Sequence, residues 1–226
     1  MTNPPLDVAA SLENLATLEA ASPGPQRIEN FTARRGELAR AALAALADHG
    51  FAQTSLREIA RKTDFSHGVL HYYFTDKVDL ITCAVRDYKA ICVTRYDHLL
   101  VDAITEEEFV QGFIDVALDS LVKEAPLHRL WYDLRVQAMF LDAYREEILK
   151  IDARLEDMVW AVFQRYCEIK GTQPKIAKST LYGLFDGIFQ VSLLKLVAGT
   201  PEHELLLGEE IRLLLKTCAN DMQPAG

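Results

Sequence analysis

The sequence is poor in cysteine and has no cysteine pair in redox or metal-binding spacing. Four cysteines occur in 226 residues, Cys83, Cys92, Cys167 and Cys218, and no C-x-x-C motif is present. In a chain of this size, scattered cysteines favour buried, reduced thiols over a disulfide framework. We therefore expect a cytoplasmic protein without disulfides.

Targeting and membrane signals are also missing. The first residues, MTNPPLDVAASLENLATLEAASPGP, have no basic n-region and no long apolar run, so we expect no signal peptide. We find no stretch that approaches the roughly 20 apolar residues of a membrane span. No membrane partner is expected.

Motifs for catalysis and metal binding are absent as well. The sequence has no nucleophile elbow, no phosphate loop and no H-E-x-x-H. His67 and His71 have the i, i+4 spacing of a zinc-binding pair, but Gly-Val-Leu between them offers no glutamate base, and no third ligand is nearby. We expect no enzyme activity, no cofactor and no metal site.

Basic charge is in deficit overall but not in every segment. The net charge is −9, which argues against nucleic-acid binding by the whole surface. Residues 27–77 carry eight Lys or Arg against six Asp or Glu, a balance of +2, so the rest of the chain carries −11. A local basic face in the N-terminal part is compatible with these numbers.

The residues that are present follow a helical period almost throughout. Half of them are apolar, and no convincing run alternates with period two. We expect an all-α fold: a mobile arm at 1–26 that contains the chain break Pro23-Gly24-Pro25, a three-helix unit at 27–76, and a larger helical unit at 77–226. A long helix from Thr75 to about Leu100 is expected to connect the two units.

Capping signals divide the N-terminal unit into short helices. Gly50 closes the first helix, and Ser55-x-x-Glu58 is a capping box that opens the second. Ser66 is the predicted cap of the third helix and Thr75 that of the fourth. Three short helices with a tight turn at Asp64-Phe65 form a helix-turn-helix plan, whose third helix is expected to display His67, Gly68, Val69, His71 and Tyr72.

These N-terminal residues resemble the DNA-binding domain of TetR-family transcriptional regulators. The matching residues run from the first-helix pattern through His49-Gly50-Phe51, Thr54-Ser55-Leu56-x-x-Ile59-Ala60 and Ser66-x-Gly68-x-Leu70-x-Tyr72-Tyr73-Phe74-x-x-Lys77-x-x-Leu80. The sequence departs from the family at Asp64, where the turn usually has glycine and which we expect to tolerate a left-handed conformation. It departs again at His71, which stands where the family often has tyrosine.

The resemblance implies an N-terminal helix-turn-helix DNA-binding domain and a helical ligand-binding and dimerisation domain. The implied phosphate contacts are Thr54, Tyr73 and Lys77, with Ser66 as cap and phosphate donor. The implied base-reading strip is His67, Gly68, Val69 and Tyr72. Arg34, Arg57 and His71 are further candidates for contact with the DNA.

The C-terminal unit offers a candidate ligand cleft. Taken alone, each aromatic side chain here is more typical of an ordinary core than of a cleft. The expected lining residues are Phe113, Trp131, Tyr132, Arg135, Met139, Phe163, Phe185 and Phe189. Arg135 could meet an anionic ligand, or pair with Asp133 or Glu124. The identity of a small-molecule effector is not encoded in any recognisable motif.

A helix over about 174–198 is apolar on almost its whole circumference, so it must be covered on more than one side. Small residues recur along one line of it. We predict a homodimer interface made by this helix and the last one, through Ser179, Gly183, Gly187, Val191, Ile211, Leu214 and Leu215. The alternative is a central helix of a monomeric bundle.

Together these features predict a homodimeric, ligand-responsive transcriptional regulator, and a repressor that binds a double-stranded, inverted-repeat operator. The first alternative is a DNA-binding regulator without a ligand. An all-α enzyme that uses the C-terminal aromatic cleft is the alternative from another class.

Overall fold

The computed structural model describes residues 25–49, 55–101, 105–200 and 203–221. Nearly all of the predicted arm, at residues 1–24, lies outside these ranges. The described chain is almost wholly helical, as expected. Its elements are α2 (Pro25–His49), α3 (Leu56–Lys62), α4 (His67–Tyr73), α5 (Lys77–Thr94), α6 (Asp97–Val101), α7 (Glu106–Lys123), α8 (Ala125–Ala138), α9 (Asp142–Lys170), β1 (Thr172–Pro174), α10 (Lys178–Val197), α11 (His203–Cys218) and β2 (Ala219–Asp221).

Helices α2, α3 and α4 form the head of the molecule, and their ends follow from local chemistry. The side chain of Ser55 accepts a hydrogen bond from the Glu58 amide, and the Glu58 carboxylate accepts one from the Ser55 amide, so the predicted capping box is confirmed. Ser66 caps α4 by accepting from the Val69 amide at 3.2 Å. The start of each of these two seven-residue helices is therefore fixed by the serine that precedes it.

Two predicted details of the head are wrong. The cap of α5 is Asp76, whose side chain accepts from the Asp79 amide, while Thr75 donates to the Asp79 carboxylate from outside the helix. The turn between α3 and α4 forms without a left-handed Asp64, because every described residue with positive φ is a glycine. Thr63 leaves α3 in an extended conformation instead, at φ −120° and ψ 163°.

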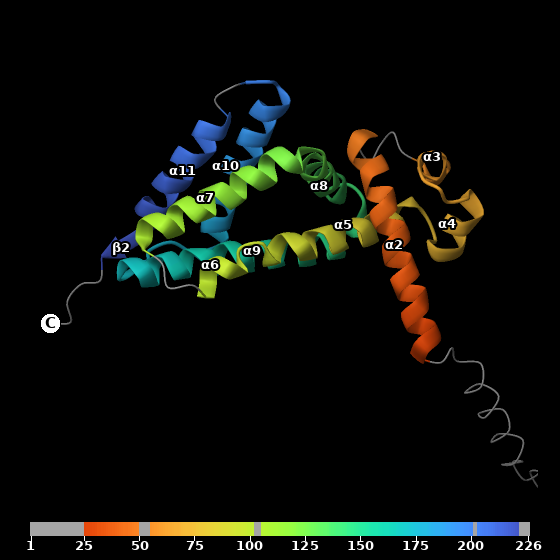
Figure 1. Ribbon diagram of the computed structural model, residues 1–226, viewed down its shortest axis with the longest axis horizontal. Helices are drawn as coiled ribbons and strands as arrows, with labels where there is room; N and C mark the ends of the chain where they lie inside the picture. The colour runs from red at the N-terminus through yellow and green to blue at the C-terminus, as the bar shows by residue number, and fades with distance from the viewer. Residues whose placement is uncertain (1–24, 50–54, 102–104, 201–202, 222–226) are drawn as a thin grey trace, which may run out of the picture.

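The remaining elements form the body. Figure 1 shows the head at one end, with α5 running from it along the body beside α9, and α10 and α11 paired farther from the head. The expected long connecting helix is shorter than predicted, since α5 ends at Thr94 and α6 follows it. The other end of the body holds a small feature that the sequence did not suggest, the antiparallel pair of β1 and β2.

The core does not divide where the sequence predicted a domain boundary. One buried cluster contains Leu38 and Leu70 of the head together with Trp131 of α8 and Leu155 of α9. A second cluster lies within the body and joins α7, α9, α10 and α11 through residues such as Phe113 and Phe163. Helices α5 and α8 thus pack directly against α2 of the head, in the same cluster that holds Leu70 of α4.

Helix α10 is long and apolar enough to cross a membrane by length and composition, with a mean hydropathy of 1.3. This corrects the expectation that no stretch approaches such a span. Only 28% of the qualifying window is buried within the chain. The exposed apolar side chains of this helix include Leu184, Val191, Leu194 and Val197. The helix therefore presents an apolar face that the chain itself does not cover.

Candidate functional site

Helix α4 separates its residues into a buried side and a displayed side. Leu70 is 0% exposed and Phe74, directly after the helix, is 1% exposed, whereas Tyr72 is 68% exposed. Gly68, Val69 and His71 are also exposed, and His67 is half-buried. The predicted outer strip is thus brought together on one face, with hydrogen-bonding tips around a small centre at Gly68.

His67 and His71 are in direct contact on this face. Their Nε2 atoms are 3.1 Å apart, so one ring donates a hydrogen bond to the other when both are neutral. Desolvation, followed by repulsion from His71 and Arg57, lowers the pKa of His67 below its ordinary value. Within the described residues, no group of three His, Cys, Asp or Glu side chains could hold a metal ion.

An aromatic contact missed by the sequence analysis supports α4 from α2. The ring of Phe31 stacks on that of Tyr73 with centroids 4.8 Å apart, and it meets Tyr72 edge-on at 6.1 Å. Tyr73 is therefore half-buried, and only part of its surface is available for a contact. Phe31 lies about two turns before Leu38, the first of the regularly spaced apolar residues of this helix, so the apolar period did not indicate it.

The predicted basic residues differ in their surroundings. Arg34 is exposed, pairs with Glu37 at 2.7 Å and lies over the Phe65 ring at 5.4 Å. Arg57 is exposed on α3. Lys77, the first residue of α5, is half-buried, and desolvation lowers the pKa of its ammonium group. Thr54 lies outside the described residues.

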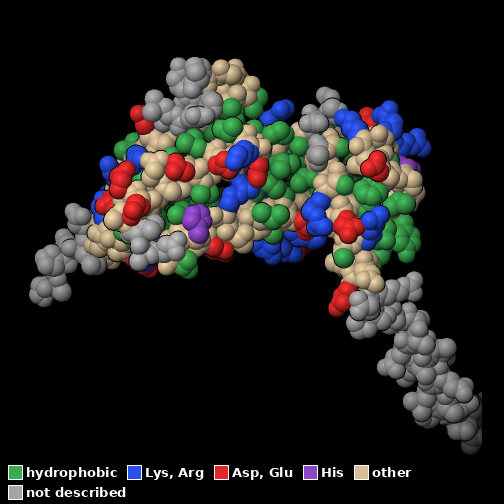
Figure 2. Space-filling view, viewed as in Figure 1, with side chains coloured by type: hydrophobic (Ala, Val, Ile, Leu, Met, Phe, Trp, Pro, Cys, Tyr) green, Lys and Arg blue, Asp and Glu red, His purple; other side chains and the backbone are tan. Residues whose placement is uncertain are grey.

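Positive charge gathers at the outer end of the head. Figure 2 shows Lys and Arg side chains clustered over the region of α3, and the exposed members of that helix are Arg57, Arg61 and Lys62. Arg61 and Lys62 were not selected from the sequence, although both lie in the last turn of α3 next to the turn that leads to α4. The local basic face allowed by the charge distribution is therefore present.

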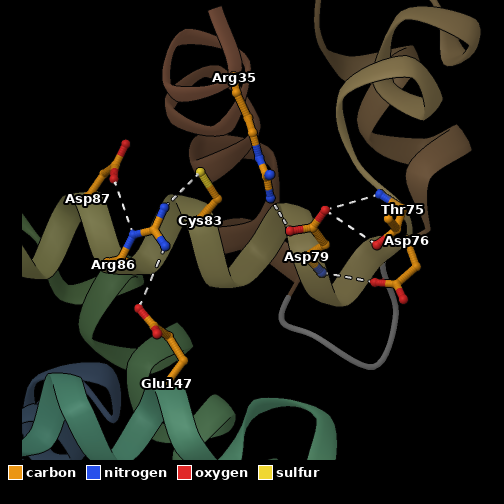
Figure 3. A network of polar contacts seen from close by, with 8 residues as sticks. All are labelled: Arg35, Thr75, Asp76, Asp79, Cys83, Arg86, Asp87 and Glu147. Atoms are coloured by element: carbon orange, nitrogen blue, oxygen red, sulfur yellow. Dashed lines mark hydrogen bonds and ion pairs between the residues drawn. The ribbon is translucent and has the colours of Figure 1, made fainter. Parts of the chain in front are cut away.

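A polar network links the head to the body. In Figure 3, Arg35 of α2 reaches the Asp79 carboxylate at the start of α5, and that carboxylate also accepts a hydrogen bond from the Thr75 amide at 3.1 Å. The Arg35 guanidinium lies over the Phe74 ring at 5.0 Å. One side chain of α2 thus contacts both the end of α4 and the start of α5.

The body contains a cavity of about 60 Å³ between α5, α7, α8, α9 and α10. Four of the predicted ligand residues line it, namely Trp131, Tyr132, Phe185 and Phe189. The lining residues that the sequence analysis did not select are Lys89, Cys92, Arg95, Tyr96, Ser120, His128, Leu155, Met158, Val159, Tyr182 and Asp186. Three of these come from α9, and Lys89 and Cys92 come from α5, which was interpreted only as a connecting helix.

The other four predicted ligand residues do not line the cavity. Phe113 and Phe163 are 2% and 1% exposed and belong to the core cluster of the body. Met139 is 71% exposed just after α8. Arg135 forms ion pairs with Asp186 at 2.6 Å and Asp152 at 3.4 Å. The predicted alternative of an ion pair is therefore confirmed, but the partners are not the expected Asp133 or Glu124.

One side of the cavity is a connected chain of polar groups. Arg95 donates to both oxygens of Glu124, at 2.7 and 2.6 Å, and Tyr88 donates to Glu124 at 2.5 Å. Arg95 also donates to the Ser120 hydroxyl, which lies 2.9 Å from Nε2 of His128. Burial lowers the pKa of His128 to about 3, with further lowering from Lys89 and Arg95, so this imidazole is neutral near pH 7.

A second group of polar side chains joins α8, α9 and α10 beside the cavity. Tyr132 donates to Asp186 at 3.0 Å, and Tyr182 donates to Asp152. Because Arg135 bridges these same two carboxylates, each of them has both a cationic and a phenolic partner. Desolvation raises the pKa of both tyrosines, so both remain hydrogen-bond donors.

Lys89 is the exception among the charged groups of the cavity. It is 5% exposed, and its ammonium lies over the rings of Trp131 and Tyr88, at 4.9 and 5.4 Å from their centroids. Burial lowers its pKa to about 8, against the opposing influence of Cys92 and Asp186. A signal was present in the sequence, since Lys89 lies four residues after Val85 on the apolar stripe of this helix.

The predicted dimer residues fall into two groups. Ser179, Gly183 and Val191 are exposed on α10, and a Cβ added to Gly183 or Gly187 would meet no other atom within 4 Å. Ile211, Leu214 and Leu215 are instead buried at 0%, 8% and 3% in the core of the same chain. Those three cannot form an external face, and among the α11 residues whose side chains are described the exposed large apolar one is Leu213, at 58%.

Comparison with known proteins points to one family. Residues 38–82 match the family of bacterial regulatory proteins called the tetR family. The chain is 26% identical over 159 residues to the HTH-type transcriptional regulator BetI of Ectopseudomonas mendocina, covering 69% of this chain and 80% of that protein. It is 28% identical over 162 residues to BetI of Cronobacter sakazakii, covering 69% and 77%.

Solved structures share the fold at lower identity. The fatty acid degradation regulator FadR of Bacillus halodurans superimposes with a TM-score of 0.65 at 16% identity, over 86% of this chain and 96% of that one. FadR of Bacillus subtilis, solved in complex with stearoyl-CoA, gives a TM-score of 0.62 at 16% identity, over 79% and 96%. These likenesses extend along the head and the body alike.

Proposed function

Since the chain belongs to the TetR family of transcriptional regulators, we propose that it is a ligand-responsive repressor that binds an inverted-repeat DNA operator as a homodimer. The observation that carries this proposal is the displayed face of α4, where hydrogen-bonding tips stand over a fully buried support. A short, rigid helix with this division fits the major groove, in which each base pair has a distinct pattern of donors and acceptors.

The proposed contacts divide into two kinds. His67, Gly68, Val69 and Tyr72 face the bases, and Val69 supplies an apolar contact of the kind that a thymine methyl accepts. Thr54, Ser66, Tyr73 and Lys77 hold the phosphates, Lys77 at the N-terminus of α5, where the helix dipole also attracts an anion. Arg34, Arg57 and His71 complete the set. The acidic remainder of the chain confines DNA binding to the head.

The proposed dimer forms through the uncovered face of α10. Leu184, Val191, Leu194 and Val197 are 45% to 69% exposed there, and Gly183 and Gly187 leave open space beside them. An exposed apolar patch of this kind marks a contact surface in a protein that works in water. A second copy of the same face covers it with two-fold symmetry, which matches the symmetry of an inverted repeat.

The proposed response runs along α5. This helix contributes Lys89, Cys92 and Arg95 to the cavity, and its first turn is tied to the head through Arg35 and Asp79. A ligand that prefers a tilted α5 displaces the head and weakens operator binding, and operator DNA must then weaken ligand binding by the same factor. A coupling of about 1–3 kcal/mol corresponds to roughly 5- to 150-fold.

A regulator without a ligand is the second candidate, and one observation favours it. The cavity of about 60 Å³ is small beside the roughly 300–1,000 Å³ of typical ligand sites. The Bacillus subtilis FadR structure contains stearoyl-CoA, which supports the ligand-responsive version for this fold. Titration of a bound ligand with and without operator separates the two, because equal affinities leave only the scaffold version.

Selection of bound duplexes from random DNA is the most informative test. We expect an inverted repeat whose half-site centres are about one helical turn apart, or a multiple of it, and binding that weakens steeply with salt. Recovery of a single asymmetric site would contradict the homodimer, and failure to enrich any sequence would contradict DNA reading by α4.

A further inference from the structure

Lys89 brings a positive charge into the cavity without a counter-ion in contact. Across the described ranges, its ammonium makes no hydrogen bond or ion pair, and the rings of Trp131 and Tyr88 lie against it. The two arginines near the same cavity, unlike Lys89, each have a carboxylate partner: Arg95 pairs with Glu124, and Arg135 pairs with Asp186. A buried charge without a paired partner is strongly unfavourable, so its presence calls for an explanation.

Neighbouring helices supply carboxylates, but each one is already engaged. Glu124, which ends α7, accepts hydrogen bonds from Arg95 and Tyr88. Asp186 of α10 accepts from Arg135 and Tyr132, and Asp152 of α9 from Tyr182 and Arg135. The other titratable groups nearby are Cys92 of α5 and His128 of α8, the latter neutral near pH 7. The tyrosines around the cavity, Tyr88, Tyr96, Tyr132 and Tyr182, have pKa values raised by burial and stay neutral. None of them supplies an anion in contact with Lys89.

The apolar side chains that line the cavity favour a ligand with an apolar part. Phe185 and Phe189 of α10 present aromatic rings, and Leu155, Met158 and Val159 of α9 present aliphatic surface. A volume of about 60 Å³ holds roughly four waters, so only a compact molecule enters without displacement of side chains.

We propose, on the basis of the ligand-responsive function inferred above, that the effector is a compact organic carboxylate whose anionic group binds Lys89 and whose apolar part lies against the aromatic rings. The carboxylate supplies the counter-ion that the fold omits, through a charge-assisted hydrogen bond to the ammonium. An organic cation is disfavoured, because Lys89 repels it and the carboxylates around the cavity already have cationic or phenolic partners.

Isothermal titration calorimetry on the full chain tests this assignment with defined probes. Sodium acetate, butyrate, hexanoate and benzoate provide a size series, butyramide and benzamide are the neutral counterparts, and tetramethylammonium is the cationic probe. We expect at least one carboxylate to bind at least tenfold more tightly than its amide and than the cation. Lys89→Met should reduce the affinity for that carboxylate at least tenfold and leave the affinity for the amide unchanged.

Lys123→Met is the matched control, because Lys123 is exposed on α7 and pairs with Asp119 outside the cavity. It should leave carboxylate binding unchanged. A second measurement needs no variant. Since burial lowers the pKa of Lys89 to about 8, affinity for the carboxylate should fall about tenfold per pH unit above that value, while affinity for the amide stays flat.

Several outcomes would overturn the assignment. They are the absence of millimolar or tighter binding by any carboxylate, equal affinity for carboxylate and amide, or an unchanged affinity in Lys89→Met with native helicity. Selection of random DNA is run separately. If an inverted repeat is enriched but no carboxylate binds, the carboxylate proposal falls and the regulatory function stands. If a carboxylate binds through Lys89 but no DNA is enriched, the site stands and the regulatory function falls.

Discussion

The head and the cavity differ in how far their polar side chains are exposed to solvent. In the head, polar tips such as those of Tyr72 and His71 stand in solvent over a buried apolar support. In the cavity, Lys89 and His128 are each only 5% exposed and are surrounded by aromatic rings. The exposed polar groups of the head therefore lower the stability of the fold very little, whereas the body contains groups whose charged forms are destabilised by burial.

This difference teaches how the two regions are expected to respond to change. Substitution on the displayed face of α4 alters what is bound and leaves stability nearly unchanged, because those side chains contribute little to the core. Substitution in the cavity alters stability and binding together. The same reasoning distinguishes the apolar face of α10, which is exposed but not polar and is expected to be covered by a second copy.

The largest expected effect concerns that α10 face. The double variant Gly183→Leu, Gly187→Leu adds bulk where the chain itself offers open space, so the fold of each copy should persist while the dimer contact is overpacked. Sedimentation should show the mass halved with helicity retained by circular dichroism. A mass that stays dimeric would move the interface elsewhere, and loss of helicity would favour the central-helix alternative.

The second prediction concerns the stability that Lys89 removes. Its pKa, lowered from 10.5 to about 8, means that the unfolded chain binds more protons between these values. The native state is therefore penalised by about 3 kcal/mol below pH 8, and the penalty fades as the pH rises toward 10.5. Lys89→Met should raise the free energy of unfolding in urea by about 3 kcal/mol at pH 7 and by about half as much at pH 9.5. An equal gain at both pH values would show that the lysine is neutral or paired.

The third prediction concerns His128, whose pKa is lowered from 6.5 to about 3. The unfolded chain takes up a proton between pH 6.5 and 3 that the folded chain refuses, so stability falls on acidification through this window. Between pH 7 and pH 5 the loss attributable to His128 is about 2 kcal/mol. His128→Gln keeps an amide group near Ser120 and should remove that portion of the loss in urea titrations. A variant with the same acid sensitivity as the unaltered chain would refute the buried, neutral state.

The fourth prediction turns to the head. Lys77→Ala should weaken binding to all duplexes alike and flatten the slope of log affinity against log salt by about 0.9, the loss of one phosphate contact. Fluorescence anisotropy with the selected operator at several salt concentrations measures this slope. Arg145→Ala, in the first turn of α9 in the body, is the control and should leave the slope unchanged. An unaltered slope in Lys77→Ala would remove this residue from the interface.

The smallest expected effect is that of Val69→Ala. Val69 is 36% exposed at the centre of the displayed strip, so removing two methyl groups should relax base preference at one or two positions of each half-site by less than about 1 kcal/mol. The salt slope and the thermal midpoint should stay constant, unlike those of the cavity variants. Repeated selection with the variant decides the matter, since an unchanged motif would place the base-reading strip elsewhere.

Local signals determined the head almost completely. The Ser55–Glu58 capping box, the Ser66 cap and the alternation of buried Leu70 with displayed Tyr72 all act within one or two turns, so the sequence specified them without reference to the rest of the chain. The resemblance to the family was strongest in the same segment, and the match over residues 38–82 confirmed it. The helical spacing of the apolar residues likewise predicted the all-α architecture.

Only the tertiary structure decided which residues of the body meet. Arg135 pairs with Asp152 and Asp186, which are 17 and 51 residues away, and no local pattern encodes such distances. Periodicity placed Phe113, Phe163 and Ile211 on apolar faces. It did not distinguish a core face from a cavity wall or a subunit contact, because these three kinds of surface are made of the same types of side chain. Lys89 shows the same division. Its position among apolar residues was visible in the sequence, but the absence of a carboxylate in contact with it, among the described residues, depended on where α7, α9 and α10 came to lie.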